Sequence, residues 1–194
     1  MQTKQQIQQL LASAGLSPNK RLGQHFLIDL NLMRLLVKSA HIRSNDIVLE
    51  VGCGTGSLTE ALAETAGMVI AVERDKALAQ IAKRQLALYP LYRTVQGKTK
   101  NIQIINTDIL ETKSTISRTV IKAIQLCRKK YLGQVLLVAN LPYNVACPVM
   151  LNLLTLHRSG TGLTGPVMAD GMYVTVQKEV ARRITAAPGQ KHYG

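Results

Sequence analysis

Short, continuous apolar runs that alternate with helical patterns are the feature of this sequence that most constrains its fold. From residue 46 onward, runs rich in Val, Ile and Leu recur, and helical patterns fall between them. Strands that are buried on both faces are continuously apolar, and strands separated by helices pair in parallel. The sequence therefore predicts an α/β fold with a mostly parallel, doubly wound sheet.

This alternation assigns strands and helices to definite ranges. The predicted strands are Ile47–Val51, Met68–Glu73, Ile102–Ile105, Val135–Ala139 and Met172–Gln177. The predicted helices lie near residues 57–65, 75–88, 113–130, 147–157 and 178–186. A chain of 194 residues can form one such domain but is short for two. We expect this domain to span residues 46–194 and to be incomplete, because no natural edge element closes it.

Residues 1–45 are expected to form an N-terminal helical segment. A first helix ends near Gly15, and a second begins near Asp29, which is an acceptable N-cap. The apolar faces are Ile7, Leu10, Leu11 and Ala14 in the first helix, and Leu32, Leu35 and Leu36 in the second.

The net charge points to a polyanionic partner. Lys and Arg number 24 against 11 Asp and Glu, which gives +13 at pH 7 and a pI near 10.0. A surplus of this size favours a polyanionic partner, because each neutralised phosphate releases counterions; the alternative is that the charge serves solubility only. The basic helix near 113–130, together with residues 92–101, is expected to be the most exposed region.

Cysteine spacing and hydropathy exclude several classes of protein. Cys53, Cys127 and Cys147 are far apart, so no zinc site, other metal site or disulfide framework is predicted. The N-terminus lacks the apolar stretch of a secretory signal, and the apolar region 135–156 is interrupted by Asn and Pro. We expect a cytoplasmic monomer that does not bind membranes.

A glycine-rich loop follows the first predicted strand. Gly52, Gly54 and Gly56 allow the backbone to turn sharply and to approach a ligand without a Cβ in the way. The segment 57–60 then has the pattern of a capping box. Such a loop by itself is weak evidence, because many nucleotide-binding folds carry a similar one.

Two carboxylates next to this loop narrow the choice of ligand. Glu73 ends the second predicted strand, where it can accept both hydroxyls of a ribose. Glu50 stands at the head of the loop and either supports the loop or faces a cationic group. A nicotinamide dinucleotide requires G-x-G-x-x-G, whereas this loop is G-x-G-x-G, so we predict S-adenosylmethionine as the cofactor. Asp108, which follows the third strand, is placed to meet the adenine amino group of that cofactor.

The segment Asn140-Leu141-Pro142-Tyr143 ends the fourth predicted strand. An exocyclic adenine amine is a poor nucleophile, because its lone pair is delocalised into the ring. The side-chain carbonyl of Asn140 and the backbone carbonyl of Leu141 can hold its two hydrogens and tilt that lone pair toward the cofactor's methyl group. Tyr143 offers a face on which the base can stack once it leaves its own stack. The segment predicts methyl transfer to the N6 atom of adenine.

Taken together, these segments resemble the ribosomal RNA adenine dimethylase family over nearly the whole chain. The matching motifs are K-R-L-G-Q-H-F-L (20–27), L-E-V-G-C-G-T-G (49–56), V-E-R-D (72–75), N-T-D (106–108), N-L-P-Y-N-V-A-C-P (140–148), Q-K-E-V-A-R-R (177–183) and P-G-Q-K-H-Y-G (188–194). The resemblance implies a Rossmann-like fold and dimethylation of two adjacent adenosines in small-subunit (16S) rRNA during ribosome biogenesis. It also implies a catalytic role for Asn140 with Leu141 and Tyr143. The expected cofactor-binding residues are His25, Leu27, Gly52, Gly54, Glu73, Asp108 and Asn140.

The resemblance also implies that the last strands of the sheet and a helical C-terminal domain would follow residue 194. Three alternatives remain open at this point. The chain could be a 23S rRNA adenine N6-methyltransferase of the macrolide-resistance type, a non-catalytic RNA-binding assembly factor, or a nicotinamide-dependent dehydrogenase.

Overall fold

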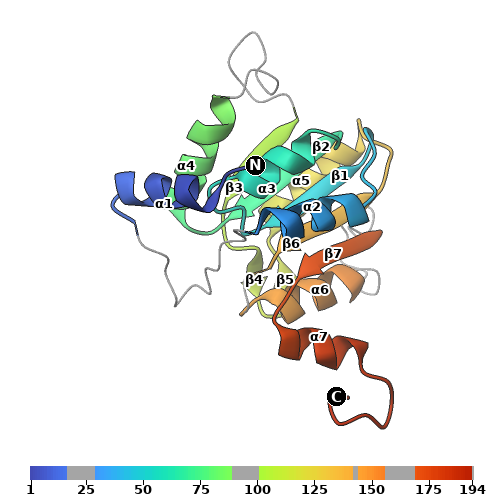
Figure 1. Cartoon of the computed structure of the whole chain (residues 1–194). Helices are drawn as coiled ribbons and strands as arrows, with labels where there is room; N and C mark the ends of the chain where they lie inside the picture. Colours follow the sequence, from blue (N-terminus) through green and yellow to red (C-terminus); the bar gives the residue numbers. More distant parts are fainter. Residues whose placement is uncertain (17–28, 89–100, 142–143, 156–168, 194) are drawn as a thin grey trace.

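The core of the protein is a single parallel sheet. The computed structural model describes residues 1–16, 29–88, 101–141, 144–155 and 169–193 (Figure 1). Within them a five-stranded sheet has the order β3-β2-β1-β6-β7, and every neighbouring pair is parallel. Its strands are β1 (Ile47–Val51), β2 (Met68–Glu73), β3 (Ile102–Asn106), β6 (Val135–Asn140) and β7 (Gly171–Thr175). The predicted α/β fold class is confirmed.

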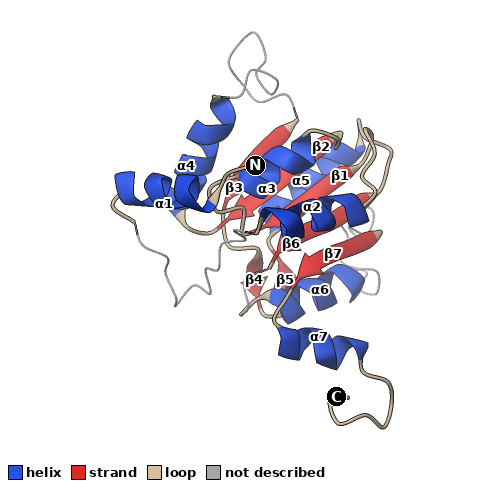
Figure 2. Ribbon diagram, viewed as in Figure 1, coloured by secondary structure: helices blue, strands red, loops and turns tan. Residues whose placement is uncertain are grey.

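Helices lie on both faces of this sheet (Figure 2). The helices on the two faces are α2 (Leu30–Ser39), α3 (Ser57–Ala63), α4 (Lys76–Ala87), α5 (Arg118–Arg128) and α6 (Ala146–Thr155). Of the other described helices, α1 (Lys4–Ser13) packs against α4, and α7 (Lys178–Thr185) has no buried residue. Asp29 is the N-cap of α2 as predicted, since its Oδ1 accepts hydrogen bonds from Asn31 N and Leu32 N. No helix in the described part of the chain is long and apolar enough to cross a membrane.

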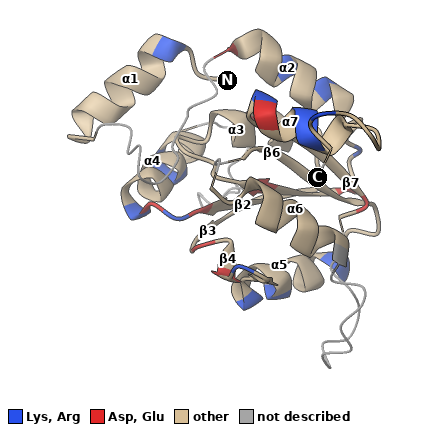
Figure 3. Ribbon diagram, turned by 90° about the horizontal axis from the view of Figure 1, so that it is seen from below, with Lys and Arg blue, Asp and Glu red and all other residues tan. Residues whose placement is uncertain are grey.

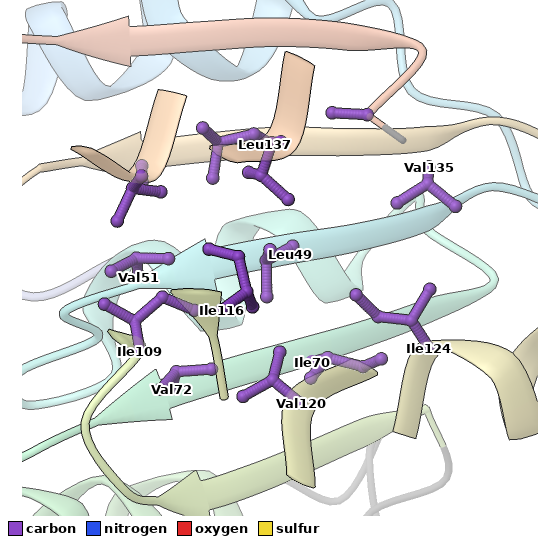
Figure 4. Packing of buried hydrophobic residues seen from close by; sticks show 14 of the residues in the cluster. Leu49, Val51, Ile70, Val72, Ile109, Ile116, Val120, Ile124, Val135 and Leu137 are labelled. Atoms are coloured by element: carbon purple, nitrogen blue, oxygen red, sulfur yellow. The ribbon is translucent and has the colours of Figure 1, made fainter. Parts of the chain in front are cut away.

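Alternate residues of the strands enter two different cores, which explains their continuous apolar runs. Ile47 and Leu49 of β1 face a cluster that contains the buried sides of α5 and α6 (Figure 4). Val48, between them, faces a second cluster that contains α2, α3 and α4. All three side chains are fully buried. A strand covered on both faces needs apolar residues at every position, whereas a half-exposed strand needs them at every second one.

One predicted helix is too long at its N-terminal end. Residues 113–130 were expected to be helical, but α5 begins at Arg118. The preceding residues form an antiparallel hairpin of β4 (Leu110–Thr112) and β5 (Thr115–Ile116). Thr112 donates a side-chain hydrogen bond to Thr115, and Ile116 is fully buried in the core. β-Branched residues lose side-chain freedom in a helix, so this pairing is favoured over an extra helical turn.

The predicted apolar face of α2 is wrong in part. Leu36 is buried, but Leu32 and Leu35 are 39% and 58% exposed. Met33 takes their place, and it packs with Leu36 in the second core cluster. The helix has apolar residues on more than one side, and only its packing against the sheet decides which of them are buried. The predicted division into residues 1–45 and 46–194 stays a prediction.

Replacing Leu137 with Ala tests the sheet core. Leu137 lies in the middle of β6 and is fully buried, so its truncation should lower the free energy of unfolding by about 2–5 kcal/mol. Leu132→Ala is the matched control, because Leu132 is 86% exposed. Denaturant unfolding of both variants measures the difference, and equal losses would contradict the assigned burial.

Candidate cofactor and substrate site

The carboxyl ends of the parallel strands gather the polar residues at one edge of the sheet. β1 lies in the middle, with β2 and β3 on one side and β6 and β7 on the other. In such a sheet, ligands bind outside the carboxyl ends at the point where the strand order reverses, which here lies between β1 and β6. Glu73 ends β2, and Asn140 ends β6. The glycine loop after β1 therefore lies between these two residues.

The glycine loop has a backbone that other residues rarely adopt. Gly52, Gly54 and Gly56 have φ values of +78°, +57° and +86°. A Cβ on Gly56 would also lie 3.3 Å from a side-chain carbon of Leu86. The loop is fastened to β2, because Gly52 N donates to Val72 O at 2.8 Å. The predicted need for glycine at these positions has a geometric basis.

Glu73 holds the loop directly. Its Oε2 accepts a hydrogen bond from Gly54 N at 2.8 Å, and its Oε1 accepts one from Asp75 N at 2.9 Å. Burial raises the pKa of Glu73 above its ordinary value, although these backbone hydrogen bonds oppose the shift. Asn106 at the end of β3 donates to Glu73 O at 2.8 Å. The loop and the ends of β2 and β3 form one hydrogen-bonded unit.

Glu50 is fully buried beneath the loop. Thr59 of α3 donates to its Oε2 at 2.6 Å. Burial raises the pKa of Glu50 to about 8, with a smaller contribution from nearby Glu73. The sequence allowed Glu50 either to support the loop or to face a cationic group. Its hydrogen bond with Thr59 is a contact of the first kind, because it joins β1 to the helix that follows the loop.

The predicted capping box at residues 57–60 is wrong. Gly56 is the N-cap of α3, in the left-handed conformation, and makes no side-chain cap. Ser57 Oγ instead accepts a hydrogen bond from Gln2 N at 2.7 Å, and the Glu60 carboxylate lies 2.9 Å from the amino group of Met1. Ser57 and Glu60 thus contact the N-terminal segment and do not cap α3. The local pattern could not indicate this, because Met1 and Gln2 are distant in sequence.

Gln2 contacts the glycine loop through its side chain as well. Its Nε2 donates to Thr55 O at 3.1 Å, and its Oε1 accepts from Thr55 Oγ1 at 2.6 Å. Gln2 is only 5% exposed, so these polar groups are paired away from water. Sequence analysis missed this residue, because a glutamine near the N-terminus carries no motif. α1, which follows Gln2, packs against α4 through Ile7, Leu11, Leu78 and Ile81.

Asp108 lies in the turn after β3, beside the end of β2. Its Oδ1 accepts from Leu110 N at 3.1 Å, and its Oδ2 lies 3.2 Å from Nη1 of Arg74. The Asp108 side chain is 38% exposed. The structure thus brings Asp108 into contact with Arg74, the residue that follows Glu73, and the role of Asp108 in cofactor binding stays a prediction.

Asn140 and Leu141 lie at the end of β6, next to β7. Asn140 pairs with Thr175, whose hydroxyl donates to Asn140 Oδ1 at 2.6 Å. Leu141 is buried, and its N–H donates to Thr175 O at 3.3 Å. Of the other predicted site residues, His25, Leu27 and Tyr143 lie outside the described residues. Among the residues that the structure describes, no cluster of His, Cys, Asp and Glu could hold a metal ion.

Comparison with known proteins identifies the family of this chain. Residues 15–194 match the model of a family described as ribosomal RNA adenine dimethylase. The chain belongs to the ribosomal RNA adenine dimethylase family. The predicted resemblance is therefore confirmed.

Curated members of the family align with the whole of this chain. It is 38% identical over 192 residues to a ribosomal RNA small subunit methyltransferase A of Staphylococcus epidermidis. It is 35% identical over 195 residues to a probable ribosomal RNA small subunit methyltransferase A of Methanopyrus kandleri. These alignments cover 99% and 100% of this chain and 56% of each relative. The chain thus spans little more than half the length of the curated relatives it matches.

Two solved structures share the fold of this family member. A dimethyladenosine transferase from Plasmodium falciparum superimposes with a TM-score of 0.60 at 24% identity, covering 87% of this chain and 49% of that one. The 23S rRNA methyltransferase ErmE superimposes with a TM-score of 0.56 at 23% identity, covering 83% and 51%. At these identities the likeness concerns the fold, and it confirms the Rossmann-like architecture.

The raised pKa of Glu50 predicts a pH-dependent stability. Between about pH 4.5 and pH 8 the unfolded chain loses the proton of Glu50 while the folded chain keeps it. Folding stability should therefore fall as pH rises through this range, by up to about 1.4 kcal/mol per pH unit. Glu50→Gln removes this ionisation, so its stability relative to the unmutated chain should increase from pH 5 to pH 8. Parallel stability curves in denaturant titrations would contradict the prediction.

Replacing Gln2 with Ala tests the contact between the N-terminal segment and the loop. The change leaves Thr55 without its buried partner, so the free energy of unfolding should fall by about 1–3 kcal/mol. Gln5→Ala is the matched control, because Gln5 is exposed on α1. Denaturant unfolding measures both, and an unchanged midpoint for Gln2→Ala would show that the contact does not stabilise the fold.

Proposed function

We propose that this chain is an S-adenosylmethionine-dependent methyltransferase that dimethylates the N6 amine of two adjacent adenosines in small-subunit rRNA. The observation that carries the proposal is the location of two groups of residues on either side of the point between β1 and β6 where the strand order reverses. The glycine loop and Glu73 lie on one side, and Asn140 and Leu141 lie on the other. A cofactor site and an acceptor site at neighbouring strand ends are what a methyl transfer requires.

The residues present fit S-adenosylmethionine, which when bound supplies a methyl group on a cationic sulfur. Gly52 and Gly54 present backbone without a Cβ, which permits the close approach of a ligand. Glu73 carries a carboxylate at the end of β2, and each of its oxygens can accept a hydrogen bond beyond the one it has. Asp108 contacts Arg74, which follows Glu73, and we assign its carboxylate the role of accepting from the cofactor's adenine amine. The proposed contacts at His25 and Leu27 rest on the family motif.

Asn140 and Leu141 provide the acceptors for the substrate amine. The Asn140 Oδ1 atom and the Leu141 backbone carbonyl would each accept one N–H of adenine. These two hydrogen bonds orient the amine so that its lone pair, which is otherwise delocalised into the ring, points to the methyl group. They also stabilise the positive charge that develops on the nitrogen during the transfer. We assign Tyr143 the role of stacking the base, on the strength of its place in the motif.

The charge distribution supports an RNA partner. Lys and Arg residues occur along α5 and its flanks, and also on α7 (Figure 3). The exposed cationic residues on and around α5 are Lys113, Arg118, Lys122, Arg128, Lys129 and Lys130. Such a surface contacts phosphates without reading the base sequence. It therefore supplies affinity for RNA, while selection of the target adenosines depends on the RNA's shape.

Asn140→Ala tests the catalytic assignment. Loss of the side-chain acceptor should reduce methyl transfer to purified 30S particles by about a hundredfold or more. RNA binding should stay largely intact, because the basic surface is unchanged. Asn31→Ala is the matched control, since Asn31 is exposed on α2 and lies outside the family motifs. Equal activities of Asn140→Ala and the unmutated chain would contradict the assignment.

The acceptor RNA and the cofactor are tested with the unmutated chain. We expect radiolabelled methyl groups in 30S particles and not in protein-free 23S RNA. Labelling of 23S RNA alone would identify a methylase of the macrolide-resistance type. RNA binding without any methyl transfer would identify a non-catalytic factor. Calorimetric binding of NAD in place of S-adenosylmethionine would identify a dehydrogenase.

A further inference from the structure

Thr175 is the residue of β7 that lies directly beside the proposed acceptor of the substrate amine. We propose that it is a positioning residue that holds the Asn140 side chain in the orientation needed for methyl transfer, an assignment that rests on the function proposed above. Thr175 is the last residue of β7, and its register partner on β6 is Asn140. The family motif around Asn140 does not include it, because it lies on a separate strand.

Two hydrogen bonds join Thr175 to the acceptor segment. Its hydroxyl donates to Asn140 Oδ1 at 2.6 Å, and its backbone carbonyl accepts from Leu141 N at 3.3 Å. The first bond involves the side-chain acceptor of the amine, and the second involves the residue whose carbonyl is the other acceptor. Thr175 therefore contacts both residues that are to hold the adenine N–H groups.

The need for such a contact follows from the side chain of asparagine. Its terminal torsion is broad and has no sharply staggered minima, so hydrogen bonds must determine the direction of the amide oxygen. Threonine is a suitable donor, because its branched Cβ restricts the rotation of the side chain that carries the hydroxyl. A carbonyl oxygen can accept two hydrogen bonds, so the bond from Thr175 is compatible with a second from an adenine amine.

The backbone and side-chain contacts of Thr175 can be separated by mutation. Thr175→Val preserves the shape of the side chain and the backbone carbonyl, but removes the hydroxyl. Leu141 then keeps its hydrogen bond while Asn140 loses one. Thr175→Ser keeps the hydroxyl without the methyl group. Thr185→Val is the matched control, because the Thr185 hydroxyl donates to Ala181 O within α7.

Steady-state methylation of 30S particles by the four proteins tests the proposal. We expect Thr175→Val to lower kcat roughly three- to tenfold, which is the effect of one hydrogen bond. The KM for 30S particles and the calorimetric affinity for S-adenosylmethionine should stay unchanged, because the lost hydrogen bond stabilises the transition state and not the bound ground state. Thr175→Ser should restore most of the lost kcat, and Thr185→Val should match the unmutated chain.

Three results would overturn the assignment. The first is an unchanged kcat for Thr175→Val. The second is a loss in Thr175→Ser as large as that in Thr175→Val, which would show that side-chain size is responsible. The third is a fall in the melting temperature and in the cofactor affinity of Thr175→Val that accompanies the loss of kcat, which would indicate a purely structural role. Absence of methyl transfer by the unmutated chain contradicts the proposed function itself, and it is detected before any variant is compared.

Discussion

The parallel pairing of β1 with β6 is the constraint on which the rest of this structure depends. Ile47, Val48 and Leu49 pair with Val135, Leu136 and Leu137, and all six side chains are buried in the two core clusters. This pairing brings the glycine loop and the segment that starts at Asn140 to the same edge of the sheet. Because a shift of one residue would exchange the two faces of a strand, core packing also sets the positions of the polar residues that follow.

Residues at the site are held mainly by partners from other segments of the chain. Glu73 of β2 binds the amide of Gly54, Gln2 binds Thr55, and Thr175 binds Asn140. Each of these bonds connects residues that are distant in sequence, so the site is fixed only once the sheet and α1 are in place. A site preorganised in this way meets its ligands with little further loss of conformational freedom.

Much of this arrangement can be predicted from the residues. Continuous apolar runs located the five strands of the main sheet closely, because strands covered on both faces leave a strong signal. Prediction failed where local patterns were ambiguous. The segment before Arg118 forms a hairpin because Ile116 is buried in the core, and α2 buries Met33 where Leu35 was expected. The pattern at Ser57 resembled a capping box, but its hydroxyl is bound by Gln2.

The sequence by itself determined the alternation of strands and helices, the glycine loop and the family, since these depend on residue types at short spacings. Tertiary structure alone decided that Gln2 contacts the loop and that Thr175 contacts Asn140. Neither residue belongs to a recognisable pattern, because each acquires its role from the register of a neighbouring strand or from helix packing. The protonation of Glu50 also depends on tertiary structure, because burial in the folded core raises its pKa to about 8. The charge and orientation of a side chain are properties of its surroundings, and folding creates those surroundings.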